Sequence, residues 1–123
     1  MTIREAIDQA DVLRPNTVSE TEKHIWLAQL DGTVRSQIHD RHEGAQEAPD
    51  IGADRTQEDS TPLLVEMPYT GVYVYWLMAQ IDLALGELTR YNNDMLLYNM
   101  ALTEYAAAYK RSHLPKRGSQ FVR

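Results

Sequence analysis

A ladder of apolar side chains between residues 74 and 109 constrains the fold of this chain more than any other feature. Its steps alternate between three and four residues, which is the spacing of one face of an α-helix, and it stays in phase for about ten turns. Its members are Val74, Leu77, Ile81, Ala84, Leu88, Tyr91, Met95, Tyr98, Leu102, Tyr105 and Tyr109. The pattern predicts one long helix over residues 68–113, because Pro68 suits a first helical turn and Pro115 cannot continue a helix.

Gly86 and the run Asn92-Asn93-Asp94 are the two places where this helix is open to interruption. Asn and Asp compete for backbone hydrogen bonds and favour helix caps. The ladder keeps its phase across both places. We therefore expect one helix, at most kinked near residues 86–93, rather than a tight antiparallel hairpin.

Two shorter helices are predicted earlier in the chain. The runs Thr2-Ile3-Arg4-Glu5 and Ser19-Glu20-Thr21-Glu22 have the spacing of capping boxes, and they predict helices over residues 2–11 and 19–42. Gly32 lies inside the second helix, where it predicts a bend or a tight contact. The buried side of that helix is expected to consist of Trp26, Leu27, Leu30, Val34 and Ile38.

The chain is therefore expected to be all-α, with a single small helical domain over residues 1–113. Residues 43–67 form a long polar loop, and residues 114–123 form an extended basic tail. Within the loop, Leu63-Leu64-Val65 is either a short edge strand or an extended piece packed on the helices. A polar loop of this length in a compact domain is disordered or functional, and a partner molecule is the economical reason for it to be ordered.

Composition excludes several classes of protein. The net charge of −6 argues against a general nucleic-acid binder, which normally carries a basic face. The absence of cysteine excludes disulfides, thiolate metal sites and a cysteine nucleophile. The start of the chain lacks the apolar segment of a signal peptide, and the longest apolar run, residues 72–79, is too short to span a bilayer. We therefore expect a soluble protein, made inside the cell, with no membrane partner.

The charges are unevenly distributed along the chain. Seven acidic residues and one Arg lie between Glu43 and Glu66, whereas five basic residues and no acidic residue lie between Lys110 and Arg123. The candidate acidic loop residues are Glu43, Glu47, Asp50, Asp54, Glu58 and Asp59, and the candidate tail residues are Lys116, Arg117, Phe121, Val122 and Arg123. Either both segments are solvated surface, or they attract each other within one chain or between neighbouring chains.

The segment His39-Asp40-Arg41-His42-Glu43 places two histidines one helical turn apart beside carboxylates, which is compatible with a metal site. It lacks the histidine spacing of zinc proteases, and it lies at a helix C-terminus, where the helix dipole favours histidine. We interpret these two histidines as cap or surface residues, and His24 and His113 as isolated and exposed. The sequence shows no carboxylate pair in an apolar pocket and no nucleophile or phosphate-binding motif. We therefore expect no enzymatic activity, no cofactor and no metal.

Aromatic residues form a second stripe, Tyr69, Tyr73 and Trp76, beside the first part of the ladder. Tyrosine is enriched where one side of a residue is buried and the other is wet. The stripe is therefore either ordinary core with its hydroxyl groups at the rim, or a face that a neighbouring molecule covers. Two apolar faces on one helix exceed what about a hundred residues can bury, so we predict self-association through these three residues.

Short runs spread over most of the chain, except the polar loop, carry a resemblance to a known family. In the C-terminal half they are Leu63-Leu64-Val65, Pro68-Tyr69, Tyr73-Val74-Tyr75-Trp76-Leu77, Ala79, Ile81-Asp82, Gly86-Glu87, Arg90-Tyr91-Asn92-Asn93, Asn99, Tyr105, Tyr109 and Arg111-Ser112-His113-Leu114-Pro115. In the N-terminal half they are Trp26-Leu27, Leu30-Asp31-Gly32 and His42-Glu43-Gly44. In these runs the chain resembles the head–tail connector proteins of tailed bacteriophages, also called head completion or adaptor proteins.

The resemblance implies a small, all-helical structural protein of the virion, made in the host cytoplasm, with no enzymatic role. Such proteins form a ring of about a dozen copies beneath the portal protein. The ring extends the DNA channel and docks the next tail or stopper protein, and DNA passes through without sequence-specific binding. On this resemblance the polar loop faces the channel or an adjoining ring, and the Phe121-Val122 tail reaches into the portal.

A small helical regulatory or DNA-associated protein, acting as a dimer through its basic tail, is the alternative. The acidic net charge and the absence of a helix-turn-helix with a basic second helix count against it. A metal-dependent enzyme built on His39 and His42 is a more distant alternative.

Overall fold

The computed structural model describes residues 1–42 and 59–114. All named secondary-structure elements in these residues are helices. The elements are α1 (Ile3–Leu13), α2 (Glu20–Gln37), the short 3-10 helix η1 (His39–Arg41), α3 (Gly71–Ala84) and α4 (Leu88–Ser112). The prediction of an all-α fold with a long C-terminal helix is confirmed. The greater part of the predicted polar loop, and the tail from residue 115 onward, lie outside the described residues.

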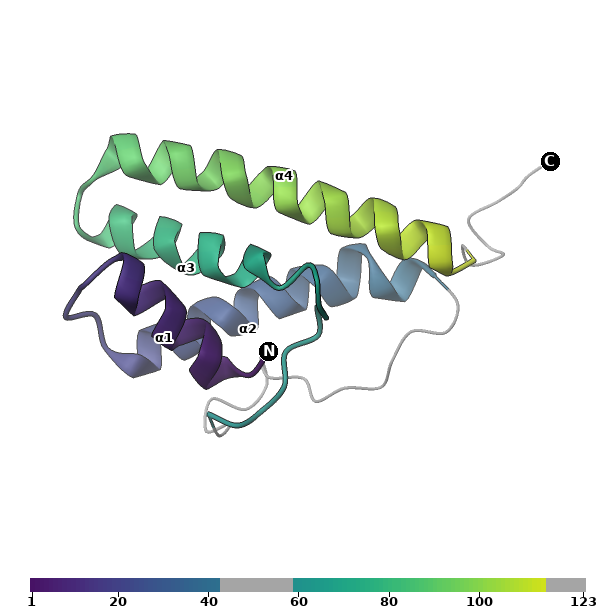
Figure 1. The fold of residues 1–123 in the computed structure, drawn as a ribbon, viewed down its shortest axis with the longest axis horizontal. Helices are drawn as coiled ribbons and strands as arrows, with labels where there is room; N and C mark the ends of the chain where they lie inside the picture. The colour runs from purple at the N-terminus through teal and green to yellow at the C-terminus, as the bar shows by residue number, and fades with distance from the viewer. Residues whose placement is uncertain (43–58, 115–123) are drawn as a thin grey trace.

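Helix α3 is the centre of the fold. In Figure 1, α4 runs along one side of α3, and α1 and α2 lie on the other. The side chains that α3 buries point in every direction around its axis: Val72, Tyr73, Val74, Leu77, Met78, Ala79, Ile81 and Asp82. A helix that is apolar on all sides is a core helix, and here the other three helices cover it.

The predicted starts of the first two helices are largely confirmed. At α1, the Glu5 N–H donates to Thr2 Oγ1 at 3.2 Å, and the Thr2 N–H donates to Glu5 Oε1 at 2.9 Å, which is a complete capping box. At α2, the Ser19 hydroxyl oxygen accepts the Glu22 N–H at 3.2 Å. The helix predicted over residues 19–42 is α2 followed by η1, since the α-helical hydrogen bonds end at residue 37.

The predicted single helix over residues 68–113 is wrong, because the chain turns back on itself at Gly86. Gly86 has a φ of 77°, which is the left-handed conformation that glycine adopts without steric cost. The Glu87 N–H donates to the Asp82 carbonyl at 2.8 Å, and the Gly86 N–H donates to the Leu83 carbonyl at 3.1 Å. This pair of bonds is a Schellman motif, which ends α3 and satisfies its last carbonyl groups. The run of Asn92-Asn93-Asp94 lies within α4 and does not interrupt it.

The ladder kept its phase across the turn because the link between the two helices is only three residues long. Both helices then direct their ladder positions to the same core, in which Tyr98 and Tyr105 are buried. The two ladder residues at the turn, Ala84 and Leu88, are exposed. A continuous phase therefore did not distinguish one helix from two antiparallel helices that share a core.

The segment before α3 is an extended piece packed on the helices. Leu63, Leu64 and Val65 are buried, and the segment pairs with the start of the chain through an isolated antiparallel bridge between Thr2 and Pro62. The Leu63 N–H donates to the Met1 carbonyl at 2.9 Å. This is the second of the two conformations that the sequence left open for these residues.

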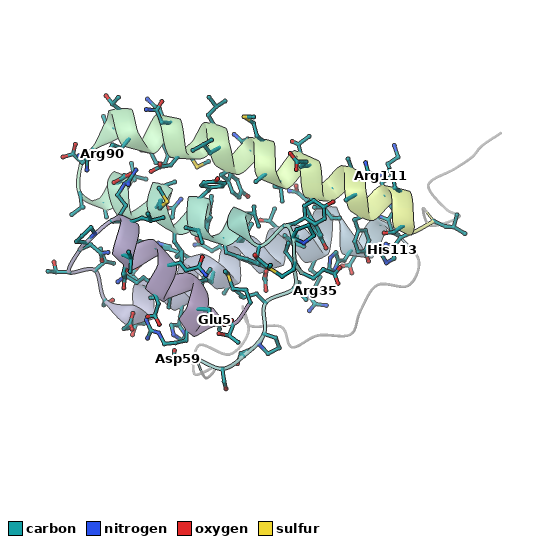
Figure 2. All side chains as sticks on the ribbon, viewed as in Figure 1. Glu5, Arg35, Asp59, Arg90, Arg111 and His113 are labelled. Carbon is teal, nitrogen blue, oxygen red and sulfur yellow. The ribbon has the colours of Figure 1, made fainter. Side chains whose placement is uncertain are left out.

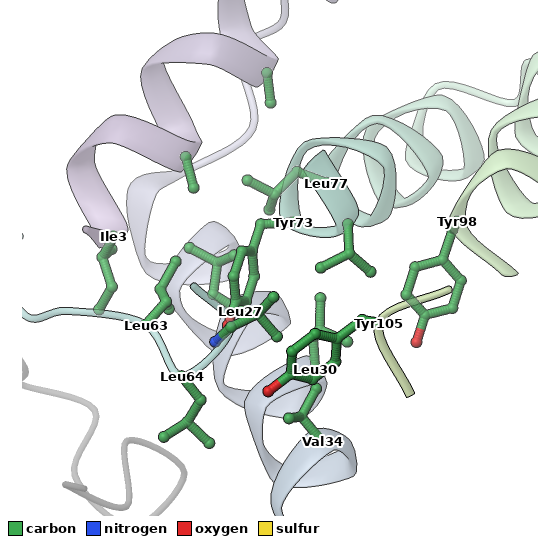
Figure 3. Packing of buried hydrophobic residues seen from close by; sticks show 14 of the residues in the cluster. Ile3, Leu27, Leu30, Val34, Leu63, Leu64, Tyr73, Leu77, Tyr98 and Tyr105 are labelled. Carbon is green, nitrogen blue, oxygen red and sulfur yellow. The ribbon is translucent and has the colours of Figure 1, made fainter. Parts of the chain in front are cut away.

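The core joins α1, α2, α3, α4 and this extended segment (Figure 3). Of the residues expected on the buried side of α2, Leu27, Leu30, Val34 and Ile38 are buried, and Trp26 packs against them half-buried. Gly32 makes no tight contact, since a Cβ atom placed there would meet nothing within 4 Å. Helix α2 passes through Gly32 without interruption.

The two glycines give a matched test of the hairpin. Gly86→Ala should lower the free energy of unfolding by about 1 kcal/mol, because alanine pays for the left-handed backbone that the turn requires. Gly32→Ala should raise it by up to about 1 kcal/mol, because alanine favours a helix interior and has open space there. Urea denaturation of both variants measures these changes. Equal destabilisation by both would contradict the turn at Gly86.

Candidate functional site

Tyr73, predicted to face a neighbouring molecule, lies in the core of its own subunit. Its hydroxyl group donates to Asp31 Oδ1 at 2.6 Å and accepts the Val65 N–H at 2.6 Å. The other carboxylate oxygen of Asp31 accepts the Leu64 N–H at 3.1 Å. Both Tyr73 and Asp31 are buried, so the prediction of an intermolecular role for Tyr73 is wrong. The residue joins α3 to α2 and to the extended segment.

Burial also sets the ionisation of this pair. Removal from water raises the pKa of Asp31 to about 6, and the hydrogen bonds from Tyr73 and Leu64 act in the opposite direction. Burial and the Asp31 charge raise the pKa of Tyr73 far above its ordinary value. The tyrosine therefore stays protonated and remains the donor in its bond to Asp31.

Tyr69 and Trp76, the other two members of the predicted stripe, are half-buried and also contact their own subunit. The Trp76 Nε1–H donates to the Trp26 carbonyl at 2.7 Å, and the Trp76 ring packs on Tyr98 with 4.9 Å between ring centroids. The Tyr69 ring lies 5.7 Å from that of Tyr105. Trp76 thus fastens α3 to α2 and α4, and Tyr69, just before α3, packs on α4.

Exposed large apolar side chains occur elsewhere, in three groups and singly at Met67 and Leu114. One group lies at the end of α1, one at the α3–α4 turn, and one in the middle of α4. Their members are Val12 and Leu13; Leu83, Leu85 and Leu88; and Leu96, Leu97 and Met100. The largest exposed fractions in the three groups are 78% for Val12, 61% for Leu88 and 62% for Leu96. These groups are apolar surface that a neighbouring molecule can cover.

Of the predicted acidic loop residues, Asp59 alone lies in the described part of the chain. Its carboxylate is 3.3 Å from Arg4 Nη1 and 2.9 Å from His24 Nε2, and its backbone carbonyl accepts the Arg4 N–H at 2.9 Å. Asp59 is therefore tied to α1 and α2, and His24 is paired rather than isolated. Outside the described residues lie Glu43, Glu47, Asp50, Asp54, Glu58, Lys116, Arg117, Phe121, Val122 and Arg123.

An aromatic cluster around Tyr109 joins the end of α4 to the end of α2 and η1. The His113 ring stacks on Tyr109 with 3.7 Å between centroids, and the His39 ring stacks on it at 4.5 Å. His42 meets the same ring edge-on at 5.4 Å. His39 Nε2 also lies 2.6 Å from the Tyr105 hydroxyl oxygen, within hydrogen-bond distance. Tyr109 thus holds three histidines from two distant parts of the chain.

This cluster corrects two predictions and supports a third. His39 is buried rather than a surface residue, and burial lowers its pKa, so the neutral imidazole is favoured. His113 is half-buried against Tyr109 rather than isolated. His42 is a helix cap as predicted, since its Nδ1 lies 2.7 Å from the Ile38 carbonyl. In residues 1–42 and 59–114, no three His, Asp or Glu side chains are grouped so as to hold a metal ion.

The Tyr109 cluster brings together the residues that directly precede two charged segments. His42 directly precedes the acidic loop. His113 directly precedes the basic tail, of which Leu114 is the one described residue. Figure 2 shows His113 and Arg111 at the C-terminal end of α4. A cleft of about 410 Å³ lies beside the cluster, lined by Glu66, Met67, Tyr69, Tyr105, Ala108, Tyr109, Arg111 and Ser112. This end is the strongest candidate for a docking site.

A buried carboxylate pair, which the sequence did not reveal, lies near the other end of the helices. Arg14 Nε donates to Asp82 Oδ2 at 3.0 Å, and Arg14 Nη2 donates to Asp94 Oδ1 at 3.4 Å. Burial raises the pKa of Asp94 to about 7, and the neighbouring Asp82 adds to the rise. The hairpin is what brings these residues of α3 and α4 together. Arg14 then holds the end of α1 against both.

Tyr73→Phe should lower the free energy of unfolding by about 1–3 kcal/mol, because it leaves Asp31 Oδ1 and the Val65 N–H buried without their partner. Thermal or urea denaturation measures the loss. Tyr91→Phe is the matched control, since Tyr91 is half-buried on α4 and makes no described side-chain hydrogen bond. Indistinguishable stabilities for the two variants would refute a structural role for the Tyr73 hydroxyl group.

Asp94→Asn should change how stability depends on pH. The pKa of Asp94 in the folded protein, about 7, lies above its ordinary 3.8. The folded state therefore binds more protons between these values, and the unfolding free energy contributed by Asp94 falls as pH rises through this window. The variant should lack this fall and gain stability relative to the parent protein above pH 7. A parent–variant difference that stays constant across denaturation curves at several pH values would show that Asp94 does not titrate in this way.

No protein-family model, curated protein sequence or solved structure to which this chain was compared matches it. Among the described residues, no helix combines the length and the apolar character needed to cross a membrane. The case for a function therefore depends on the geometry above and on the resemblance carried by the sequence runs.

Proposed function

We propose that this chain is a structural subunit of a bacteriophage head–tail connector. In this role it forms a ring beneath the portal, extends the DNA channel, and docks the next tail component. The proposal rests on one observation: the rings of His42 and His113 both contact Tyr109. The acidic loop begins directly after His42, and the basic tail begins directly after His113. The sequence resemblance supplies the class of assembly, and this geometry supplies a place where a partner can be held.

The subunit has two chemically different ends, which suits a protein placed between two other components. Helix α4 has 25 residues and is about 37 Å long. At one end is the Tyr109 cluster, with His42 and Leu114, the last described residues before the acidic loop and the basic tail continue. At the other end is the turn at Gly86, with exposed Leu83, Leu85 and Leu88. A connector meets the portal on one side and a tail or stopper protein on the other, and each end offers one of them a distinct surface.

A ring subunit also needs lateral faces, and ring contacts are head-to-tail. Helices α1 and α4, each of which carries an exposed apolar group, lie on opposite sides of α3 (Figure 1). Each group is the kind of exposed apolar surface that a neighbour covers. The net charge of −6 suits a channel through which DNA slides without sequence-specific binding. This role needs no catalytic step and no cofactor. It implies that the protein is part of the virion.

Deleting residues 114–123 tests the assignment of the tail. The truncated protein should keep its helical content, because Leu114, the one described residue removed, is exposed, and it should no longer join portal particles. Co-sedimentation with portal particles followed by negative-stain imaging measures attachment, and circular dichroism measures the fold.

The matched control is Gln29→Ala, which alters an exposed residue of α2 that belongs to none of the proposed contacts and should retain portal attachment. The reversal Lys116→Glu with Arg117→Glu separates charge from length and should weaken attachment. If the folded, truncated protein joins portal particles as well as the full chain does, the tail is not the portal contact.

A further inference from the structure

The outer face of α4 carries an exposed seam at heptad spacing. Its positions follow steps of three and four residues, which keeps them on one side of a helix that packs along another. The members are Arg90, Asn93, Leu97, Met100, Glu104 and Ala107, and all of them are exposed. This seam lies away from Tyr98 and Tyr105, which face the subunit's own core.

The centre of the seam is free of exposed charge. Between Arg90 and Glu104 the single charged residue is Asp94, and it is buried. The exposed residues of this interval are Asn92, Asn93, Leu96, Leu97, Asn99, Met100 and Thr103. Depletion of charge around apolar side chains, with charges at the rim, is the composition of a protein interface rather than of an ordinary solvated helix face.

The two charges at the rim are placed symmetrically. Arg90 and Glu104 each lie seven residues from Leu97. In an antiparallel pairing of two α4 helices about a two-fold axis at Leu97, Arg90 of each chain therefore lies opposite Glu104 of the other. Neither residue forms an ion pair within the described part of its own chain. The seam is thus complementary to a second copy of itself.

We propose that free subunits pair through this seam as an antiparallel, two-fold dimer. Leu97 and Met100 form the apolar centre of the contact, and two Arg90–Glu104 pairs flank it. A cleft of about 310 Å³ runs beside the seam, between α4 and the start of α3, and it provides further surface for the second copy. It is lined by Pro68, Tyr69, Gly71, Val72, Tyr75, Leu97, Met100, Ala101 and Glu104.

The pairing does not depend on the proposed connector function. A two-fold contact uses the same patch on both copies and closes at two subunits, whereas a ring requires head-to-tail contacts. The dimer is therefore the form of the free protein, and ring assembly would have to open it. A protein that dimerises but never joins a portal would refute the connector proposal alone, and a monomer that joins a portal would refute the dimer alone.

Charge reversal tests the pairing. The parent protein should sediment at twice its 14.1 kDa monomer mass at about 100 μM. Arg90→Glu and Glu104→Arg should each weaken dimerisation at least about tenfold, because each places like charges opposite one another twice. The double variant should dimerise as the parent does. An equal mixture of the two single variants should form a heterodimer, since both of its charge pairs are then attractive.

Arg111→Glu is the matched control, because in this register residue 111 lies opposite residue 83, which precedes α4. It should leave the dimer intact, and circular dichroism should show unchanged helicity for every variant. A monomeric parent protein at this concentration would overturn the proposal. So would single reversals that dimerise like the parent, or a mixture of them that forms no heterodimer.

Discussion

The hydrogen bonds that meet at Asp31 and Tyr73 are the interaction on which the rest of the structure depends. They join α2, α3 and the extended segment at residues 64–65 in a site closed to water. A buried carboxylate is costly unless its oxygens are satisfied, and here one hydroxyl group and one backbone N–H satisfy them. The arrangement fixes the central helix, around which α1, α2 and α4 are packed. The positions of both ends of α4, and so of the candidate docking surfaces, follow from it.

Local signals in the sequence predicted local structure well. Thr2 and Ser19 marked the starts of two helices because a cap acts within one turn, and the alternating steps of three and four residues predicted a helical C-terminal half. The hairpin at Gly86 was not predicted, because the three-residue link keeps the apolar ladder in helical phase from α3 into α4. The glycine was visible, but its left-handed conformation was not. Periodicity reports which face of a helix is buried and does not report what covers it.

That limit explains the errors at the candidate site. The stripe of Tyr73 and Trp76 was correctly identified as a second apolar face of α3, but α2 and the chain segment before α3 cover it rather than a neighbour. His39 with Tyr109, and Asp82 with Asp94, are long-range or cross-hairpin pairs for which the sequence holds no local pattern. The sequence offered one signal for the Tyr109 cluster. Tyrosines repeat along α4, and histidines stand near the ends of both α2 and α4. Seven-residue spacing of Arg90, Leu97 and Glu104 was equally visible, but its meaning required knowing which face of α4 is exposed.

The described part of the molecule is a helical unit with the Tyr109 cluster at one end, an apolar turn at the other, and further exposed apolar groups on α1 and α4. Those features suit a subunit built into a larger assembly, and the connector proposal makes that assembly specific. Imaging the full-length protein mixed with portal particles tests this claim most directly. The account predicts an added ring-shaped layer on the portal, continuous with its channel. Portal particles that stay unchanged at saturating concentrations of the folded protein would contradict it.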